Sequence, residues 1–70
     1  MYYYPNLLAE MGRKNLKQKD IADALNIKQA SISRKMNGDA PFTLKEAIFL
    51  QRFLNSEMDI PELFKEEEVS

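Results

Sequence analysis

The sequence predicts an all-α fold, a compact bundle of about five short helices in one small domain. Apolar residues recur at helical spacing in successive segments, and residues that start or end helices separate those segments. No segment alternates polar and apolar residues with the period of two that a half-buried strand needs, so no strand is expected. The 70 residues include neither cysteine nor histidine. Stability must therefore come from packing, because disulfides and an ordinary zinc site are excluded.

The first three expected helices are marked by apolar stripes and by the residues that end them. Pro5 suits a first helical turn, and the stripe after it carries that helix to about Lys14. The second helix is expected over residues 18–25 and the third over residues 28–37, where Asn37-Gly38 is a strong helix-ending pair. Between them, Asn26 tolerates a left-handed backbone. The stripes consist of Leu7, Leu8, Met11, Ile21, Ala22, Leu25, Ile32 and Met36.

The fourth expected helix opens with a capping box, because the side chains of Thr43 and Glu46 can each accept a hydrogen bond from the other's backbone. It is expected to run to about Leu54, and a short final turn follows at residues 60–64. One apolar stripe of this helix is expected to face the core, and it consists of Leu44, Ala47, Ile48 and Leu54.

Charge divides the chain, although the whole sequence has a formal net charge of only −1. Residues 1–56 hold nine basic and five acidic residues, a net +4, whereas residues 57–70 hold one basic and six acidic residues, a net −5. We therefore expect a folded domain at residues 1–64 and a disordered acidic tail at residues 65–70, polar except for Val69. A basic body is compatible with a nucleic-acid partner and also with an ordinary solvated surface.

Composition argues against several classes of function. Apolar runs such as Ala47–Leu50 are far shorter than the roughly 20 residues of a membrane span. The N-terminus lacks the pattern of a signal peptide, so we expect a cytoplasmic protein without a membrane partner. With no histidine, no cysteine and no glycine-rich phosphate loop, we expect no enzyme, no catalytic residue, no metal site, no cofactor and no small-molecule ligand.

Residues 18–38 resemble the helix-turn-helix of the phage lambda-type repressor and Cro family. The shared features are a glutamine at the start (Gln18), a hydrophobic–alanine pair (Ile21-Ala22), a buried isoleucine (Ile32) and a terminal Asn-Gly. The resemblance covers roughly residues 6–64, and residues 41–48 look like Gram-positive phage regulators in particular. It implies a lambda-repressor-like DNA-binding domain. Asn26 stands where the family usually has glycine, and lysines replace the usual polar caps of both motif helices.

The resemblance also implies which residues would meet DNA. Base contacts in the major groove are expected from Gln29, Ala30, Ser33 and Arg34, and phosphate contacts from Lys17, Gln18, Lys28 and Asn37. Lys19 and Lys35 are close enough in sequence to add positive charge. The four base-contacting side chains fall within one sector of about 140° and have suitable chemistry, but they are also what an ordinary polar helix face would carry. The lysine caps fit either a bound phosphate or merely weak capping.

Phe49 and Phe53 form a second apolar stripe on the fourth helix, and two explanations compete for it. The tyrosines at positions 2–4 can fold back over it, or it is a candidate contact in a two-fold homodimer that exists at least on DNA. The expected function is a sequence-specific regulator, a phage or prophage repressor or Cro-like protein that occupies a palindromic operator in double-stranded DNA. The alternative is a protein-interaction module on the same fold, such as an antitoxin-like or antirepressor partner.

Overall fold

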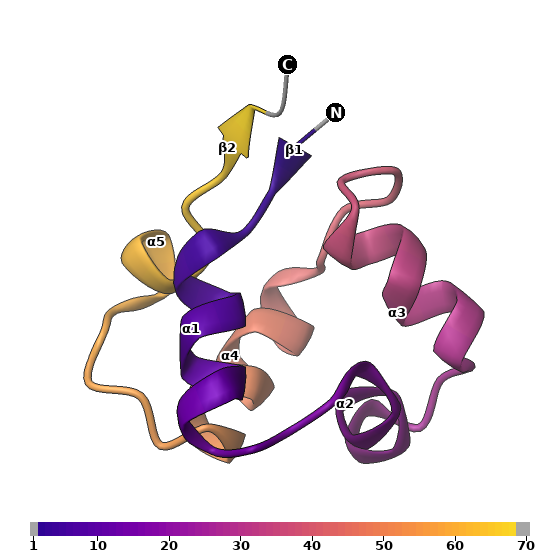
Figure 1. The fold of residues 1–70 in the computed structure, drawn as a ribbon, viewed down its shortest axis with the longest axis horizontal. Helices are drawn as coiled ribbons and strands as arrows, with labels where there is room; N and C mark the ends of the chain where they lie inside the picture. Colours follow the sequence, from indigo (N-terminus) through magenta and orange to yellow (C-terminus); the bar gives the residue numbers. More distant parts are fainter. Residues whose placement is uncertain (1, 69–70) are drawn as a thin grey trace.

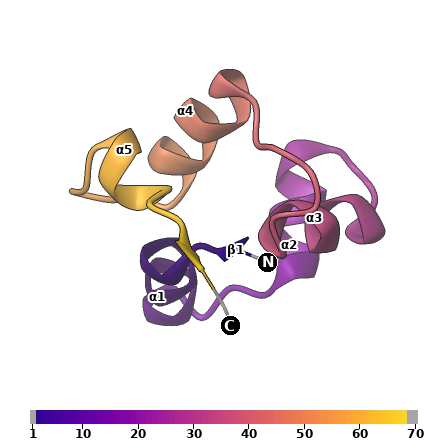
Figure 2. The ribbon, with the colours of Figure 1, turned by 90° about the horizontal axis from the view of Figure 1, so that it is seen from above.

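Five short helices and one very small strand pair make up the described part of the chain. The computed structural model describes residues 2–68, and its elements are β1 (Tyr2–Tyr3), α1 (Pro5–Arg13), α2 (Gln18–Leu25), α3 (Gln29–Met36), α4 (Leu44–Phe53), α5 (Ile60–Leu63) and β2 (Glu67–Glu68). This architecture confirms the predicted all-α bundle. Helices α1, α4 and α5 lie together, and the α2–α3 pair lies beside them (Figures 1 and 2).

The ends of the helices follow local backbone signals. Asn15, Asn26 and Asn55 have φ values of 55°, 58° and 50°, which is the left-handed conformation that lets a chain leave a helix. The predicted capping box at the start of α4 is present. Thr43 Oγ1 accepts from the Glu46 backbone N–H at 3.1 Å, and Glu46 Oε1 accepts from the Thr43 backbone N–H at 2.9 Å.

The core forms where the apolar stripes of the helices meet. Ile21 of α2 and Ile32 of α3 are completely buried, and Ala22 is 2% exposed. The small side chain of Ala22 takes little room where α2 packs into the core. The other core residues are Tyr4, Leu7, Met11, Met36, Leu50, Leu54 and Leu63. Leu25 and Ile27 are partly buried against this cluster, so the α2–α3 unit is anchored on its inner side.

The predicted core stripe of α4 is wrong at its first residue, because Leu44 is 69% exposed. Leu50 and Leu54 are completely buried and Ala47 is 6% exposed, so these three residues define the inner side of the helix. At about 100° per residue, Leu44 lies roughly 90° from the centre of that inner side. The packing of α4 against the other helices decided which of its apolar residues became core.

The chain ends also differ from prediction, because a short antiparallel pair joins them. Tyr2 pairs with Glu68 and Tyr3 with Glu67, whereas the sequence indicates no strand and a disordered tail from residue 65. Two-residue strands are too short for a period-two pattern, and each residue finds its partner at the other end of the chain. Val69 and Ser70 lie outside the described residues.

Tyr4 explains why the two ends are held together. It is 4% exposed, its ring meets those of Phe42 and Phe64 edge-on at centroid distances of 5.4 and 6.0 Å, and its hydroxyl donates to Glu66 Oε1 at 3.2 Å. Burial, together with the nearby Glu66 carboxylate, raises the pKa of the Tyr4 phenol, so the hydroxyl stays a donor at neutral pH. This tyrosine therefore packs on phenylalanines other than the predicted Phe49 and Phe53.

Candidate nucleic-acid interface

The turn between α2 and α3 has the geometry of a helix-turn-helix. Asn26 adopts the left-handed conformation, its N–H donates to the Asp23 carbonyl at 3.2 Å, and the Ile27 N–H donates to the Ala22 carbonyl at 3.0 Å. These two bonds satisfy carbonyl groups that the end of α2 would otherwise leave unpaired, in the pattern called a Schellman motif. Lys28 follows in an extended conformation, with φ −71° and ψ 148°, and is the N-cap of α3. Helix α3 therefore follows α2 after a tight turn that these two hydrogen bonds hold.

Helix α3 is clearly two-sided. Ile32 and Met36 point into the core, with exposures of 0% and 4%. On the other side the predicted base-contacting residues lie together, with Gln29, Ala30 and Arg34 exposed and Ser33 half-buried. Neither ion pair among the described residues involves Arg34, so its guanidinium is available to an external acceptor. The packing of α3 thus leaves one continuous polar strip at the surface.

The predicted phosphate contacts lie at the starts of α2 and α3 and at the end of α3. Lys17, Lys28 and Asn37 are exposed and Gln18 is half-buried. Lys17 and Lys28 are the N-caps of α2 and α3, and neither side chain caps its helix. The first turn of α2 contains Asp20, whose carboxylate accepts from the Lys17 backbone N–H at 2.8 Å. The first turn of α3 contains no acidic residue, so the positive end of its dipole stays uncompensated.

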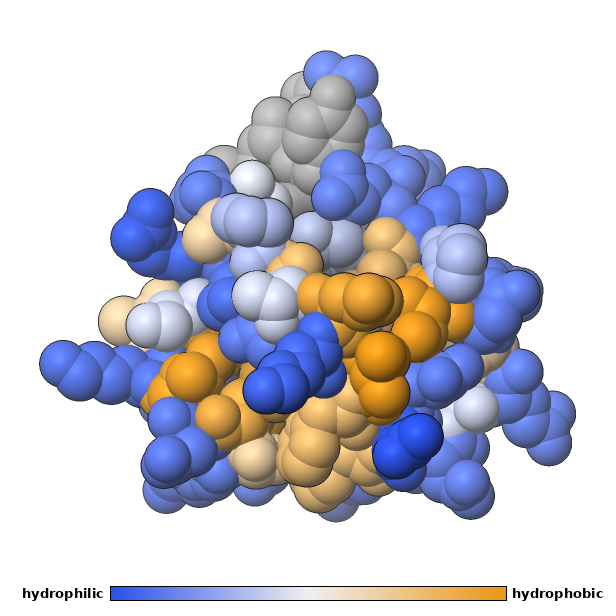
Figure 3. Space-filling view, turned by 180° about the vertical axis from the view of Figure 1, so that it is seen from behind, coloured by the Kyte–Doolittle hydropathy of each residue, from blue (hydrophilic) through white to orange (hydrophobic). Residues whose placement is uncertain are grey.

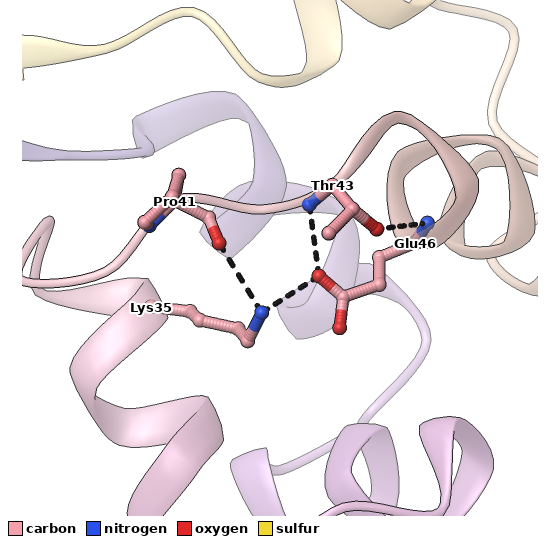
Figure 4. A network of polar contacts seen from close by, with 4 residues as sticks. All are labelled: Lys35, Pro41, Thr43 and Glu46. Atoms are coloured by element: carbon pink, nitrogen blue, oxygen red, sulfur yellow. Dashed lines mark hydrogen bonds and ion pairs between the residues drawn. The ribbon is translucent and has the colours of Figure 1, made fainter.

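Lys35 does not join the exposed lysines expected near DNA, although its position in the sequence led us to expect that it would add positive charge there. Its Nζ donates to Glu46 Oε1 at 2.7 Å and to the Pro41 carbonyl at 3.2 Å (Figure 4). The same Nζ lies 5.8 Å from the centroid of the Phe42 ring. Its side chain is 16% exposed. The ammonium therefore faces α4. The capping box identified Glu46, but no local pattern indicated that Lys35 would reach it.

Glu46 is held as a carboxylate by the same network. Burial on its own raises the pKa of this carboxyl. The hydrogen bonds from Lys35 and from the Thr43 backbone N–H, with the positive charge of Lys35, outweigh burial and hold the pKa below its usual range. At neutral pH the group is therefore a charged acceptor that ties α3 to the start of α4.

The outer side of α4 has a different chemistry. Leu44 is 69% exposed, and Phe49 and Phe53 are 42% and 43% exposed. The two phenylalanine rings stack on each other, with centroids 5.9 Å apart and an interplanar angle of 12°. Figure 3 views the face opposite to Figure 1, where α4 lies, and shows an apolar surface at its centre with hydrophilic side chains across it. Tyr4 packs on Phe42 and Phe64 instead of on these phenylalanines.

A hollow of about 520 Å³ lies away from the polar strip of α3, between α1 and the segment after α4. It is lined by residues that include Asn6, Glu10, Arg13, Asn55 and Glu62. Glu10 is 5% exposed. Its Oε1 accepts a hydrogen bond from Arg13 Nη1 at 2.6 Å, so this buried carboxylate is paired with a positive charge. In the described part of the chain, no helix is long and apolar enough to cross a membrane.

These features define a small all-α domain with a helix-turn-helix and a polar, partly basic outer surface on its second motif helix. The model of the helix-turn-helix family HTH_3 matches residues 7–60. The chain belongs to this family, the lambda repressor/Cro-like helix-turn-helix proteins, and is a DNA-binding transcription regulator of that type. The family is one of regulators rather than of enzymes. Comparisons with curated proteins and with solved structures give no significant match.

Proposed function

We propose that this protein is a phage or prophage repressor or Cro-like regulator, which blocks transcription by occupying a palindromic operator. The observation that carries the proposal is the polar strip of α3 on a helix whose other side is anchored in the core. In helix-turn-helix proteins the second motif helix enters the major groove and its first residues contact base edges. Binding to bacterial DNA would take place in the cytoplasm.

The proposed base contacts follow from the chemistry of the strip. Gln29 can pair with adenine through N6 and N7, and Arg34 can pair with guanine through O6 and N7. The methyl group of Ala30 suits a thymine methyl, and the Ser33 hydroxyl can donate or accept. Each good bidentate pair contributes about 1–3 kcal/mol of discrimination against a wrong base. Gln29 and Arg34 are therefore the residues proposed to specify most of the operator.

Phosphate contacts are proposed for Lys17, Gln18, Lys28 and Asn37. The start of α3 supports this proposal, because Lys28 and the uncompensated helix dipole place positive charge together at one exposed point. A phosphate there would supply the acceptor that a lysine N-cap cannot offer to the free backbone N–H groups. Such contacts fix the register of the protein on DNA and carry no sequence information.

A homodimer on DNA is the proposed binding unit, with Phe49 and Phe53 as its candidate contact. Their stacked, exposed rings form an apolar ridge along α4. A two-fold contact along this ridge would present two copies of α3 to the two halves of a palindrome. A single copy would read only one half-site, so pairing would supply the missing affinity.

Charge restricts how two copies can meet. At about 100° per residue, Lys45 and Arg52 fall between the Leu44–Ile48 side and the Phe49–Phe53 side of α4. A symmetric contact centred on this face would bring Lys45 against Arg52 of the other copy, and like charges would repel. A two-fold contact is therefore expected along the aromatic edge. The same cationic stripe favours the second candidate function, in which an acidic partner protein, antitoxin-like or antirepressor, docks on this face.

Selection of DNA from a random pool tests these proposals. The repressor proposal expects one enriched motif with two-fold symmetry, and binding that weakens steeply as salt concentration rises. Enrichment without symmetry would contradict the dimer but retain base recognition by α3. Absence of enrichment, with capture of an acidic protein partner, would favour the interaction module.

A further inference from the structure

The contact between Lys35 and Glu46 joins the last turn of α3 to the first turn of α4 (Figure 4). The Glu46 side chain is 18% exposed, and that of Lys35 is 16% exposed. Lysine and glutamate are seldom covered to this extent unless they are paired. The carboxylate oxygen that accepts from Lys35 also accepts from the Thr43 backbone N–H, which helps to orient it.

Main-chain bonds after α3 do not replace this contact. The Asp39 N–H donates to the Arg34 carbonyl at 2.9 Å and the Gly38 N–H to the Lys35 carbonyl at 3.2 Å, with Gly38 at φ 82°. These bonds fold the turn back onto the end of α3. Because they lie within α3 and its turn, they leave the angle between α3 and α4 to side chains, among them Lys35 and the buried Ile32 and Met36.

Lys35 is also on the far side of α3 from the proposed base contacts. At about 100° per residue, its direction is roughly 170° from the centre of the sector that runs from Gln29 to Arg34. A side chain in that direction supports the helix from behind while the opposite side faces the groove. A small change in the tilt of α3 would shift all the base-contacting side chains together, since they share one rigid helix.

We infer that Lys35 is a positioning residue: through Glu46, Pro41 and Phe42 it sets the angle at which α3 meets DNA, and so sets sequence discrimination without contacting DNA. The inference rests on the proposed reading of bases by α3. It differs from the usual role of a lysine in such a domain, which is to bind phosphate. The two roles have different signatures. Losing a phosphate contact weakens binding to every sequence and lowers the salt slope, the steepness with which log affinity falls as log salt concentration rises, by about one.

The test compares Lys35→Met and Glu46→Gln with wild type on the DNA selected from a random pool and on unrelated DNA. Methionine keeps the length and apolar stem of lysine but loses its charge. Glutamine keeps the capping box, because its amide oxygen can still accept from Thr43, but loses the carboxylate. Lys28→Met is the matched control, an exposed lysine of the same helix. Circular dichroism sets an assay temperature at which each variant is fully folded.

The positioning role predicts that Lys35→Met and Glu46→Gln each lower the ratio of specific to non-specific affinity by about three- to tenfold, with the salt slope unchanged. The double variant should lose little more than either single variant, because both break one contact. Lys28→Met should instead lower the salt slope by about one and leave the ratio nearly unchanged.

Three results would overturn the inference. The first is a Lys35→Met variant that behaves like Lys28→Met. The second is a Glu46→Gln variant that binds all DNA more tightly with a steeper salt slope, which would mean that a released Lys35 reaches phosphate. The third is a specific-to-non-specific ratio that stays at the wild-type value in both variants. If wild type itself binds no DNA, the proposed function fails, and the inference fails with it.

Discussion

Helices α3 and α4 bury one side each, but they present opposite chemistry to the outside. The exposed side of α3 is polar and begins at a lysine that does not cap the helix. The exposed side of α4 carries two stacked phenylalanines, and its start is closed by a capping box. A helix with a polar strip and an uncompensated positive end suits an anionic, hydrogen-bonding surface such as DNA. A capped helix with exposed aromatic rings suits another protein surface.

The inner side of α3 should matter most for stability. Ile32→Ala removes a completely buried side chain between α2 and the rest of the core, and should lower the free energy of unfolding by about 2–5 kcal/mol. Urea denaturation measures this loss. Ala30→Ser, a change on the exposed side of the same helix, is the control and should alter stability far less. Equal losses in the two variants would mean that α3 is not anchored by Ile32.

The aromatic side of α4 should matter most for assembly. Phe49→Ser combined with Phe53→Ser should give a folded monomer, because both rings are already more than 40% exposed. Operator affinity should fall about 10²-fold or more, since the two half-sites would no longer be bound as one unit. Analytical ultracentrifugation, with and without DNA, measures the change. A wild-type protein that remains monomeric under both conditions would remove the dimer proposal.

The polar strip should determine sequence preference. Arg34→Ala should reduce specific affinity by about 1–3 kcal/mol and relax the preference at one base pair. Its free energy of unfolding should stay close to that of wild type, because Arg34 is exposed. Binding titrations on operators with single base changes give both quantities. If affinity for random DNA falls equally, Arg34 contacts phosphate and not a base.

The start of α3 can be made to resemble the start of α4. Lys28→Ser introduces a side chain that can cap the helix, and should raise the free energy of unfolding by roughly 0.5–1 kcal/mol. If Lys28 meets phosphate, the same variant should bind DNA more weakly and with a smaller salt slope. Denaturation and salt titration together decide between the two explanations of a lysine at this position. Unchanged DNA binding would leave weak capping as the explanation.

The start of α4 should give a small dependence of stability on pH. Because folding lowers the pKa of Glu46, its contribution is fully present above the pKa of an unfolded glutamate, and is lost as pH falls through the folded pKa. Lys35 is the charged group of α3 that faces it. Glu46→Gln should be less stable at neutral pH and should approach wild type in acid. Denaturation across the acidic range measures this, and parallel curves would contradict it.

Local sequence signals were sufficient to predict the helices and the turn of the α2–α3 unit. The signals that predicted this unit depend only on neighbouring residues: its apolar stripes, the asparagine between the helices and the Asn-Gly after them. The predicted second helix has the observed bounds of α2. The exposed side of α3 followed from the same periodicity. Signals of this kind work because backbone conformation and helical spacing are set within a few residues.

Features that depend on distant partners were not predictable in the same way. The exposure of Leu44, the pairing of Tyr2–Tyr3 with Glu67–Glu68, and the reach of Lys35 to Glu46 all depend on how the helices are placed relative to one another. The sequence shows an apolar residue, a polar tail and a lysine at these places. It does not show which of several compatible neighbours each will meet.

The sequence by itself determined the helices, the turn between α2 and α3, the core stripes that meet there and the class of DNA-binding protein. The tertiary structure alone decided which side of α4 became the outer face, that Tyr4 holds the chain ends together, and that Lys35 supports α3 from behind. The physical reason is the range of the interactions. Caps and periodicity act over a single turn, whereas burial and ion pairing are settled only when whole helices pack.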